Sequence, residues 1–259
     1  MITQAQPQRL NMLYKSIFAY QRQTHSSREL VVLIERLPHL QIEYDCVKNY
    51  IASLNDSSIR LITLTKEHTL GELRNLSLIE AKGNLICQWD DDDIYHPSRL
   101  AEQYRCLSIS GLDANILSEV LLLNLQSKNL FYTNWRSTPS RGFPGSLLAK
   151  KAIVPAYQEQ GTQARLGEDL AVLNQLIAEN RVCTLSDMGY LYAYLFHEQN
   201  SWPKAHFNML VSMLSISKGL LGKKKDWLLT QLPQLDFGGD SIKIQGSNGL
   251  AYIYHPIKF

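Results

Sequence analysis

The chain has 259 residues, of which 45% are hydrophobic and 19% charged, so it is long enough for one large domain and has the composition of a folded globular protein. The 26 Lys and Arg and 24 Asp and Glu residues leave a formal charge of +2, which excludes the strongly basic surface of a protein that coats nucleic acid. Four cysteines lie far apart without CxxC spacing, which excludes a zinc finger or a disulfide framework.

The sequence also predicts a cytoplasmic protein. No stretch approaches the run of about 18 apolar residues that crosses a membrane. The first seven residues have neither the basic start nor the apolar run of a secretory signal. Cysteines without a pairing pattern fit a reducing compartment.

The first part of the chain alternates helix-like and strand-like segments. Apolar residues at a spacing of three to four predict an amphipathic helix over residues 8–22. Apolar runs at 30–34 and 59–64 have the length of buried strands, and residues 43–54 between them are weakly helical. This alternation predicts βαβ units and a mostly parallel sheet of the α/β class.

A helix and a strand lead into an acidic run. Thr69 and Glu72 form a capping-box pattern, which predicts a helix start at Thr69. Residues 84–89 indicate a buried strand that runs directly into Asp90–Asp93, and Pro97 predicts the first residue of the next helix. The four carboxylates therefore stand at the carboxyl end of a strand, where α/β folds bind ligands.

The remainder of the chain alternates less clearly. We predict a Gly/Pro-rich loop at 142–145 and a helix over 166–177. Further strands are expected at 119–125, 130–133, 181–185, 190–196, 241–245 and 250–254.

The acidic run requires a compensating charge. Two unit charges about 4 Å apart repel by about 4 kcal/mol at an effective dielectric constant near 20. A divalent cation such as Mg²⁺ or Mn²⁺, shared with substrate phosphates, would remove this repulsion. The alternative is a solvated acidic turn, which is common for acidic runs in general. The position after a buried strand favours the metal site.

Several short motifs carry a resemblance to a known family. They are Gly71–Asn75, Ala81–Gly83, Asp90–Pro97 and Leu100. Together they resemble the signature block of family 2 glycosyltransferases, in which R-N is followed by A-x-G, a strand, D-x-D-D and a Pro before a helix. The resemblance implies the GT-A fold, a mostly parallel sheet flanked by helices, over residues 1–205, with a C-terminal extension, helical and then stranded, over 206–259. It also implies that Arg74 and Asn75 contact the donor.

The same resemblance assigns roles around the acidic run. Asp90 and Asp92 form the D-x-D pair at Mn²⁺ or Mg²⁺, with Asp92 as the direct ligand of the metal that bridges the donor diphosphate, Asp90 as a further metal ligand that also binds the donor, and Asp93 in support. His197 lies in a segment similar to the family's H-G-x-N-x-W motif, where the His ligates the metal or contacts diphosphate, although Glu198 replaces the Gly. The alternative for a single His beside an aromatic strand is a core or surface residue.

Two further motifs extend the implied site. Glu168 and Asp169 resemble the family's xED motif, in which the Asp is the general base and the Glu belongs to the donor site. The alternative is a helix start, where the dipole favours acidic residues. Gly142 and Gly145 stand where GT-A enzymes have a loop beside the donor sugar, although most Gly/Pro loops are only turns.

The implied activity is metal-dependent, inverting transfer of a sugar from a nucleotide-diphosphate donor to a glycan or lipid-linked acceptor, with Asp169 as the base. The alternative is a catalytically silent GT-A-like module that binds a glycan or a protein partner. Lys223–Lys225 and Trp227 could place the protein at the inner face of a membrane, although three lysines are commonly a solvated turn.

The sequence departs from the family at its start. Family members begin with a Val/Ile-rich strand before the first helix, and none is predicted here, which suggests a shortened form. The next strand ends at Glu35 in place of the family's Asp-Asp-Gly-Ser, and Glu35 can still accept a hydrogen bond from the donor. Segments 241–245 and 250–254 have strand character, but neither ends in a nucleotide-lining turn. We therefore expect an unfilled edge beside the strand at 30–35 and weak donor binding.

Overall fold

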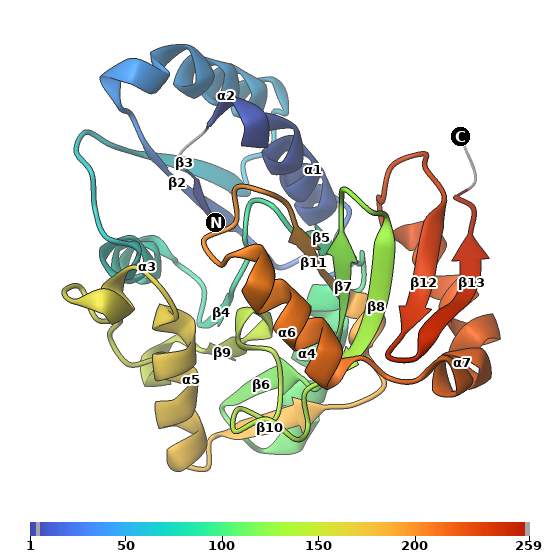
Figure 1. Cartoon of the computed structure of the whole chain (residues 1–259). Coiled ribbons are helices and arrows are strands. Elements are labelled where there is room, and N and C mark those ends of the chain that lie inside the picture. Colours follow the sequence, from blue (N-terminus) through green and yellow to red (C-terminus); the bar gives the residue numbers. More distant parts are fainter. Residues whose placement is uncertain (4–5, 257–259) are drawn as a thin grey trace.

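The computed structural model describes residues 1–3 and 6–256, and within this part of the chain the strands form three sheets (Figure 1). The first sheet is parallel throughout, with β2 in the middle. Its strands are β1 (Ile2–Thr3), β2 (Leu30–Glu35) and β3 (Ile59–Leu64). Helices α1 (Leu10–Gln21) and α2 (Gln41–Ser53) lie together beside it, at the top of Figure 1.

The alternation of side chains along β2 explains why this sheet is covered on both faces. Val32 and Ile34 join the core cluster that includes residues of α1 and α2. Val31 and Leu33 project from the opposite face and pack with α3 (Leu70–Glu80). A strand covered on both faces needs an unbroken apolar run, because successive side chains point in opposite directions. The predicted strand and the helices around it are confirmed.

The second sheet carries the strand that precedes the acidic run. Its order is β10-β6-β9-β4, in which β10 and β6 run parallel while β9 is antiparallel to β6 and β4. Helix α5 (Glu168–Ala178) packs against it through an apolar cluster. The strands are β4 (Leu85–Cys87), β6 (Ala114–Leu117), β9 (Leu148–Lys150) and β10 (Val182–Leu185).

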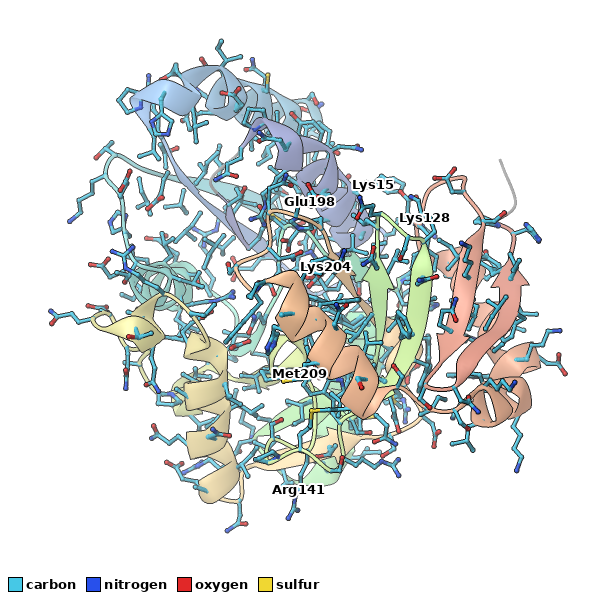
Figure 2. All side chains as sticks on the ribbon, in the orientation of Figure 1. Lys15, Lys128, Arg141, Glu198, Lys204 and Met209 are labelled. Atoms are coloured by element: carbon cyan, nitrogen blue, oxygen red, sulfur yellow. The ribbon has the colours of Figure 1, made fainter. Side chains whose placement is uncertain are left out.

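The third sheet has the order β13-β12-β8-β7-β11-β5. Helix α6 (Lys204–Leu214) packs Phe207 against β8 and β11, while its Met209 is exposed (Figure 2). Helix α7 (Lys218–Gln231) covers the hairpin formed by the last two described strands. The strands are β5 (Ile94–Tyr95), β7 (Glu119–Asn124), β8 (Asn129–Asn134), β11 (Tyr192–Phe196), β12 (Ile242–Gly246) and β13 (Gly249–Tyr254).

The prediction that no strand precedes the first helix is wrong. Ile2 pairs with Leu33 and Thr3 with Ile34, so β1 lies along the edge of β2 that faces away from β3. A strand of two residues is too short to show the alternation by which strands are predicted. As expected, the C-terminal segments do not fill this position, because β12 and β13 form a hairpin that pairs with β8.

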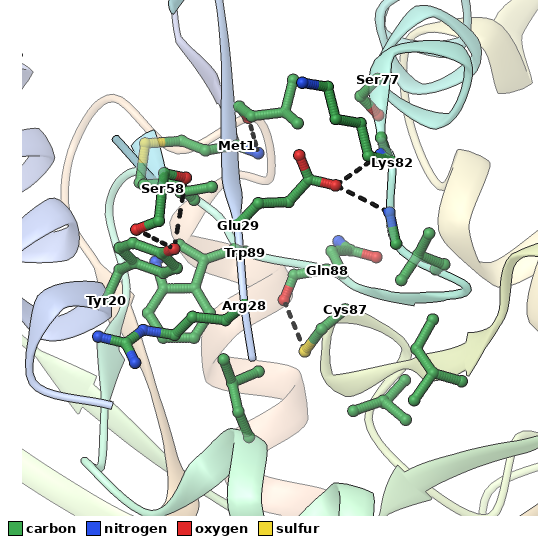
Figure 3. Close-up of a pocket in the computed structure, with 18 of the residues that line it drawn as sticks. Met1, Tyr20, Arg28, Glu29, Ser58, Ser77, Lys82, Cys87, Gln88 and Trp89 are labelled. Carbon is green, nitrogen blue, oxygen red and sulfur yellow. Dashed lines mark hydrogen bonds between the residues drawn. The ribbon is translucent and has the colours of Figure 1, made fainter. Parts of the chain in front are cut away.

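A cavity separates β2 of the first sheet from β4 of the second (Figure 3). It has a volume of about 890 Å³ and is lined by residues of both strands. Glu29 spans its rim, since its Oε1 accepts hydrogen bonds from the backbone N–H groups of Lys82 at 2.5 Å and Gly83 at 2.9 Å. Within the described residues, β2 and β4 form no ladder with each other.

The start of helix α4 (Arg99–Ser110) differs from the prediction, because Pro97 precedes the helix instead of opening it. Ser98 donates its backbone N–H to His96 Nδ1 at 3.2 Å, and its hydroxyl lies 2.8 Å from the same atom. These contacts hold residues 96–98 in a turn. The helix therefore starts only after the turn is complete.

Helix α3 begins with the predicted capping box. Glu72 donates its N–H to Thr69 Oγ1 at 3.2 Å, and Thr69 donates its N–H to Glu72 Oε2 at 2.6 Å. In the first turn, Gly71 lies directly against the chain at Gln158, because a Cβ on Gly71 would be 1.8 Å from the Gln158 backbone oxygen. Only a glycine permits this approach.

Gly71→Ala is therefore expected to lower the free energy of unfolding by about 1–3 kcal/mol, the usual cost of overpacking. Gly222→Ala on α7 is a matched control, because a Cβ there has no atom within 4 Å. The control is expected to raise stability by about 0.5–1 kcal/mol through helix propensity. Urea unfolding followed by circular dichroism measures both, and similar changes in the two variants would contradict the packing at Gly71.

Candidate active site

The acidic run forms the turn between β4 and β5, and the backbone of its first residue is held from two elements. Ser16 of α1 donates its hydroxyl to the Asp90 carbonyl at 2.8 Å. The hydroxyl of Tyr95 in β5 accepts the Asp90 N–H at 2.6 Å and donates to the Asp90 carbonyl at 3.1 Å. The turn is thereby fixed beyond the carboxyl end of β4.

Arg74 joins the acidic run to the start of α5. Its Nη2 donates to Asp90 Oδ1 and its Nε to Glu168 Oε1, each at 3.1 Å. Burial alone would lower the pKa of Arg74, but the carboxylates of Asp90 and Glu168 outweigh it and raise the pKa, so the guanidinium stays charged. Three predicted site residues thus meet in one ionic network: Arg74, Asp90 at 16 positions from it, and Glu168 at 94 positions from it.

Asp92 and His197 also lie side by side. His197 follows β11, and its Nε2 is 3.0 Å from Asp92 Oδ2. The His197 N–H donates to Asn200 Oδ1 at 2.5 Å, which fixes the loop after the strand. Figure 2 shows Glu198 on this loop, between β11 and the start of α6 at Lys204. Two of the three predicted metal ligands, Asp92 and His197, are therefore brought together from segments 105 residues apart.

Arg9 is a further cation at the acidic run. It lies in a short 3-10 helix before α1, and its Nη2 donates to Asp91 Oδ1 and, at 2.8 Å, to Asp92 Oδ2. Burial raises the pKa of Asp92, but the hydrogen bond from His197 and the charge of Arg9 outweigh it, so this pKa is lowered. Asp92 is therefore held as a carboxylate.

The other two carboxyl groups of the run are buried. Asp93 accepts hydrogen bonds from the Tyr192 hydroxyl and, at 2.8 Å, from the Leu195 N–H. Burial and then the charge of Asp92 raise the pKa of Asp93 well above its usual value. The same two causes raise the pKa of Asp91 to about 6. Asp93 thus anchors the turn to β11 instead of facing an open site.

Asp169 lies in the first turn of α5, next to Glu168. Burial and then the charge of Glu168 raise its pKa to about 6, against the lowering effect of Arg74. Its Oδ1 accepts a hydrogen bond from the Leu170 N–H at 2.8 Å. A carboxyl group with a raised pKa beside a charged network has the properties of a general base.

Asn75 is used by the fold itself. Its amide donates to the Tyr157 carbonyl at 3.0 Å and accepts the Tyr157 N–H at 2.8 Å. The same Nδ2 donates to Glu159 at 2.8 Å. The side chain therefore fastens the loop after β9 to α3, and its contact with the donor stays a prediction.

The two predicted loop glycines permit close packing. A Cβ on Gly142 would lie 2.5 Å from the Ile116 side chain of β6. A Cβ on Gly145 would lie 3.2 Å from the Tyr192 hydroxyl, which holds Asp93. This loop therefore supports the acidic turn indirectly.

Glu35 ends β2 and is 2% exposed. Its Oε1 accepts the His68 N–H at 2.7 Å, while Oε2 has no hydrogen-bond partner within the described part of the chain. A buried carboxylate oxygen without a partner is costly, and the contact of Glu35 with the donor stays a prediction.

The residues around Asp92 fit a divalent cation in part. An aspartate oxygen and an imidazole nitrogen at 3.0 Å are suitable ligand types for Mn²⁺ or Mg²⁺. Among residues 1–3 and 6–256, however, no group of three or more His, Cys, Asp or Glu is arranged to hold a metal ion alone. A cation here would need oxygen ligands from a substrate or from water.

Sequence reasoning missed Arg9 and Tyr192. Both act on the acidic run from 82 and 99 residues away, and neither stands in a local motif. The negative charge of the run indicates that a cationic side chain must lie nearby, but the sequence does not show which arginine or lysine of the chain this is.

Comparison with known proteins supports the architecture. No protein-family model matches the chain. The succinoglycan biosynthesis protein ExoO of Rhizobium meliloti is 24% identical over 169 residues, which cover 57% of this chain and 49% of the relative. The chain thus spans about half the length of this curated relative.

Solved structures match more of the chain. Staphylococcus aureus TarS, residues 1–349, matches with a TM-score of 0.57 and 13% identity over 90% of this chain and 77% of TarS. The mannosyltransferase PcManGT of Pyrobaculum calidifontis, solved with GDP-Man and Mn²⁺, matches with a TM-score of 0.55 and 15% identity over 90% of this chain and 60% of its own. The chain therefore has the GT-A fold of glycosyltransferases.

Proposed function

We propose that this protein is a metal-dependent, inverting glycosyltransferase of polysaccharide biosynthesis. It would move a sugar from a nucleotide-diphosphate donor to a glycan or lipid-linked acceptor. The fold and the similarity to a succinoglycan biosynthesis protein support glycosyl transfer. The donor class is supported by fold neighbours solved with UDP and with GDP-Man.

The observation that carries the proposal is the Arg74 network. It places the carboxylate of Asp90, after β4, and the carboxylate of Glu168, at the start of α5, on one guanidinium. Asp169 follows Glu168 directly, so the candidate base lies next to a residue of the network that includes the candidate diphosphate site. The shared guanidinium supports the reading of the acidic turn and the helix start as parts of one site.

The residues then have separate tasks. Asp169 removes the proton of the acceptor hydroxyl as it attacks the anomeric carbon. A cation held by Asp92, Asp90 and His197 would supply positive charge to the leaving diphosphate. Glu35 would accept a hydrogen bond from the nucleotide through its unpartnered oxygen. A single base with no nucleophile on the opposite face gives inversion.

The second candidate function is a silent GT-A-like binding module. Arg9 and His197 already satisfy Asp92, so the acidic run can persist in a protein without catalysis. Peripheral membrane contact through Lys223–Lys225 is also a proposal. Lys224 is engaged by Asp187 at 2.7 Å, so such contact would rest on its two neighbours. In the part of the chain that is described, no helix has the length and apolarity to span a bilayer.

Calorimetric titration with UDP, GDP and dTDP, each with Mn²⁺ and with EDTA, tests the proposal. Binding of one nucleotide that requires Mn²⁺ is expected, and incubation with its sugar donors should then release that nucleotide. Absence of binding to all three would reject the transferase and leave the binding module.

A further inference from the structure

The guanidinium of Arg9 lies where a cation is expected at the acidic run. One atom, Nη2, donates to both Asp91 Oδ1 and Asp92 Oδ2. The Arg9 side chain is 23% exposed and the Asp92 side chain 14%, so the pair is reachable from solvent. The carboxylate that the proposed function assigns to the metal is thus already paired with a positive charge of the chain.

His197 is a second group of the protein that pairs with Asp92. The backbone N–H of Gln199 donates to His197 Nδ1 at 3.2 Å, so Nδ1 is the acceptor nitrogen. Nε2 therefore carries the ring hydrogen and donates it to Asp92 Oδ2 at 3.0 Å. The same carboxylate oxygen accepts from Arg9 at 2.8 Å. Asp92 Oδ2 and His197 Nε2 are both engaged by groups of the protein itself.

Arg9 is not fully satisfied where it lies. Its Nε is buried and has no hydrogen-bond partner among the described residues. An arginine with a purely structural role is expected to use its buried donors, because each unpaired donor costs free energy. The Nε atoms of Arg28 and Arg60 are unpartnered in the same way, whereas Arg74 donates through both Nε and Nη2 to carboxylates, so the unpaired donor of Arg9 supports the inference only together with its place on Asp92.

We propose that Arg9 is a tethered counter-cation that competes with the divalent metal for Asp92. A metal ion then binds this carboxylate only when the guanidinium leaves it. The inference rests on the proposed function for the identity of the metal site. It adds that the protein without a donor binds metal weakly because its own arginine occupies the carboxylates.

The test is titration of the whole protein with Mn²⁺ alone. Binding is measured by electron paramagnetic resonance as the decrease in the signal of free Mn²⁺. Arg9→Gln is expected to bind Mn²⁺ about fivefold more tightly than wild type, which corresponds to about 1 kcal/mol, the upper value for a partly exposed ion pair that the metal must displace. The Mn²⁺ affinity of Arg9→Lys, which keeps the charge, should lie between those of wild type and Arg9→Gln. Lys15→Gln is the matched control, because Lys15 is a cation of α1 paired with Asp236 at 3.2 Å, away from the acidic run.

Mn²⁺ should also raise the thermal midpoint of Arg9→Gln more than that of wild type, since a ligand stabilises the state that binds it. Equal or weaker Mn²⁺ affinity in Arg9→Gln, or no Mn²⁺ binding by any variant, would overturn the inference. If Arg9→Gln does not fold, Arg9→Lys decides the same comparison. Because no nucleotide is present, tighter Mn²⁺ binding together with failed nucleotide titrations would leave this inference standing and reject the transferase.

Discussion

Replacing Asp169 with asparagine is expected to lower sugar transfer at least about a hundredfold while donor binding stays nearly unchanged, because a general base contributes 10² or more to the rate. Asparagine has nearly the same shape but cannot take a proton. Transfer is measured by release of the nucleotide, and donor binding by calorimetry. Glu179→Gln is the control, since Glu179 caps the other end of α5 and pairs with Arg181 at 2.8 Å.

The pH dependence of wild-type transfer gives a second readout of the same residue. Burial, Glu168 and Asp90 raise the pKa of Asp169 and Arg74 lowers it, with a result of about 6. An acid with this pKa is protonated below about pH 6 and cannot act as a base there. Transfer should therefore rise as pH increases through about 6, and Asp169→Asn should lose this rise. Normal turnover by the variant would make Asp169 only a helix-starting residue.

Asp92→Asn is expected to abolish nucleotide binding that depends on Mn²⁺. The substitution removes an anionic oxygen ligand, and a neutral amide is a much weaker ligand for a hard cation. Calorimetry with the preferred nucleotide, with Mn²⁺ and with EDTA, measures the metal-dependent part. Asp91→Asn is a matched control, because Asp91 shares the Arg9 contact but is not the predicted ligand.

If Asp92→Asn and wild type bound the nucleotide with equal affinity in the presence of Mn²⁺, the assignment of the D-x-D pair would be wrong. Thermal midpoints of all three proteins separate a lost ligand from a lost fold. Asp92 also accepts hydrogen bonds from Arg9 and His197, so a moderate decrease in stability is expected in the variant.

Elements with strong local patterns could be predicted from the sequence. The strand at Leu30–Glu35 is apolar on both faces, and the helix at Thr69 has both halves of its capping box, so each carries its own signal. Strands β6 and β9 are not predicted, and their pairing with each other joins segments distant in sequence. Local pattern cannot supply that pairing.

Part of the candidate site could also be predicted from the sequence, and part of it could not. Asp90, Asp92 and Asp169 stand in short motifs whose spacing is visible in the sequence, and the structure brings their segments together around Arg74. The way the acidic charge is compensated was not predictable, because Arg9 is 82 residues from Asp91. Arg9 and Arg74 supply part of the positive charge that the acidic run requires.

The cavity between β2 and β4 divides the network of backbone hydrogen bonds. Strand β2 is paired along its length with β3 but with only two residues of β1 on its other edge, whereas β7 in the third sheet is paired along its length with β8 and over four residues with β11. Because proteins open in cooperative units that follow such boundaries, amide hydrogens of β2 and β3 should exchange with solvent sooner than those of β7. Glu35 ends β2 and so belongs to the first of these units, whereas Asp92 lies outside it. Opening of that unit would therefore take apart the candidate site while the larger part of the protein stays folded.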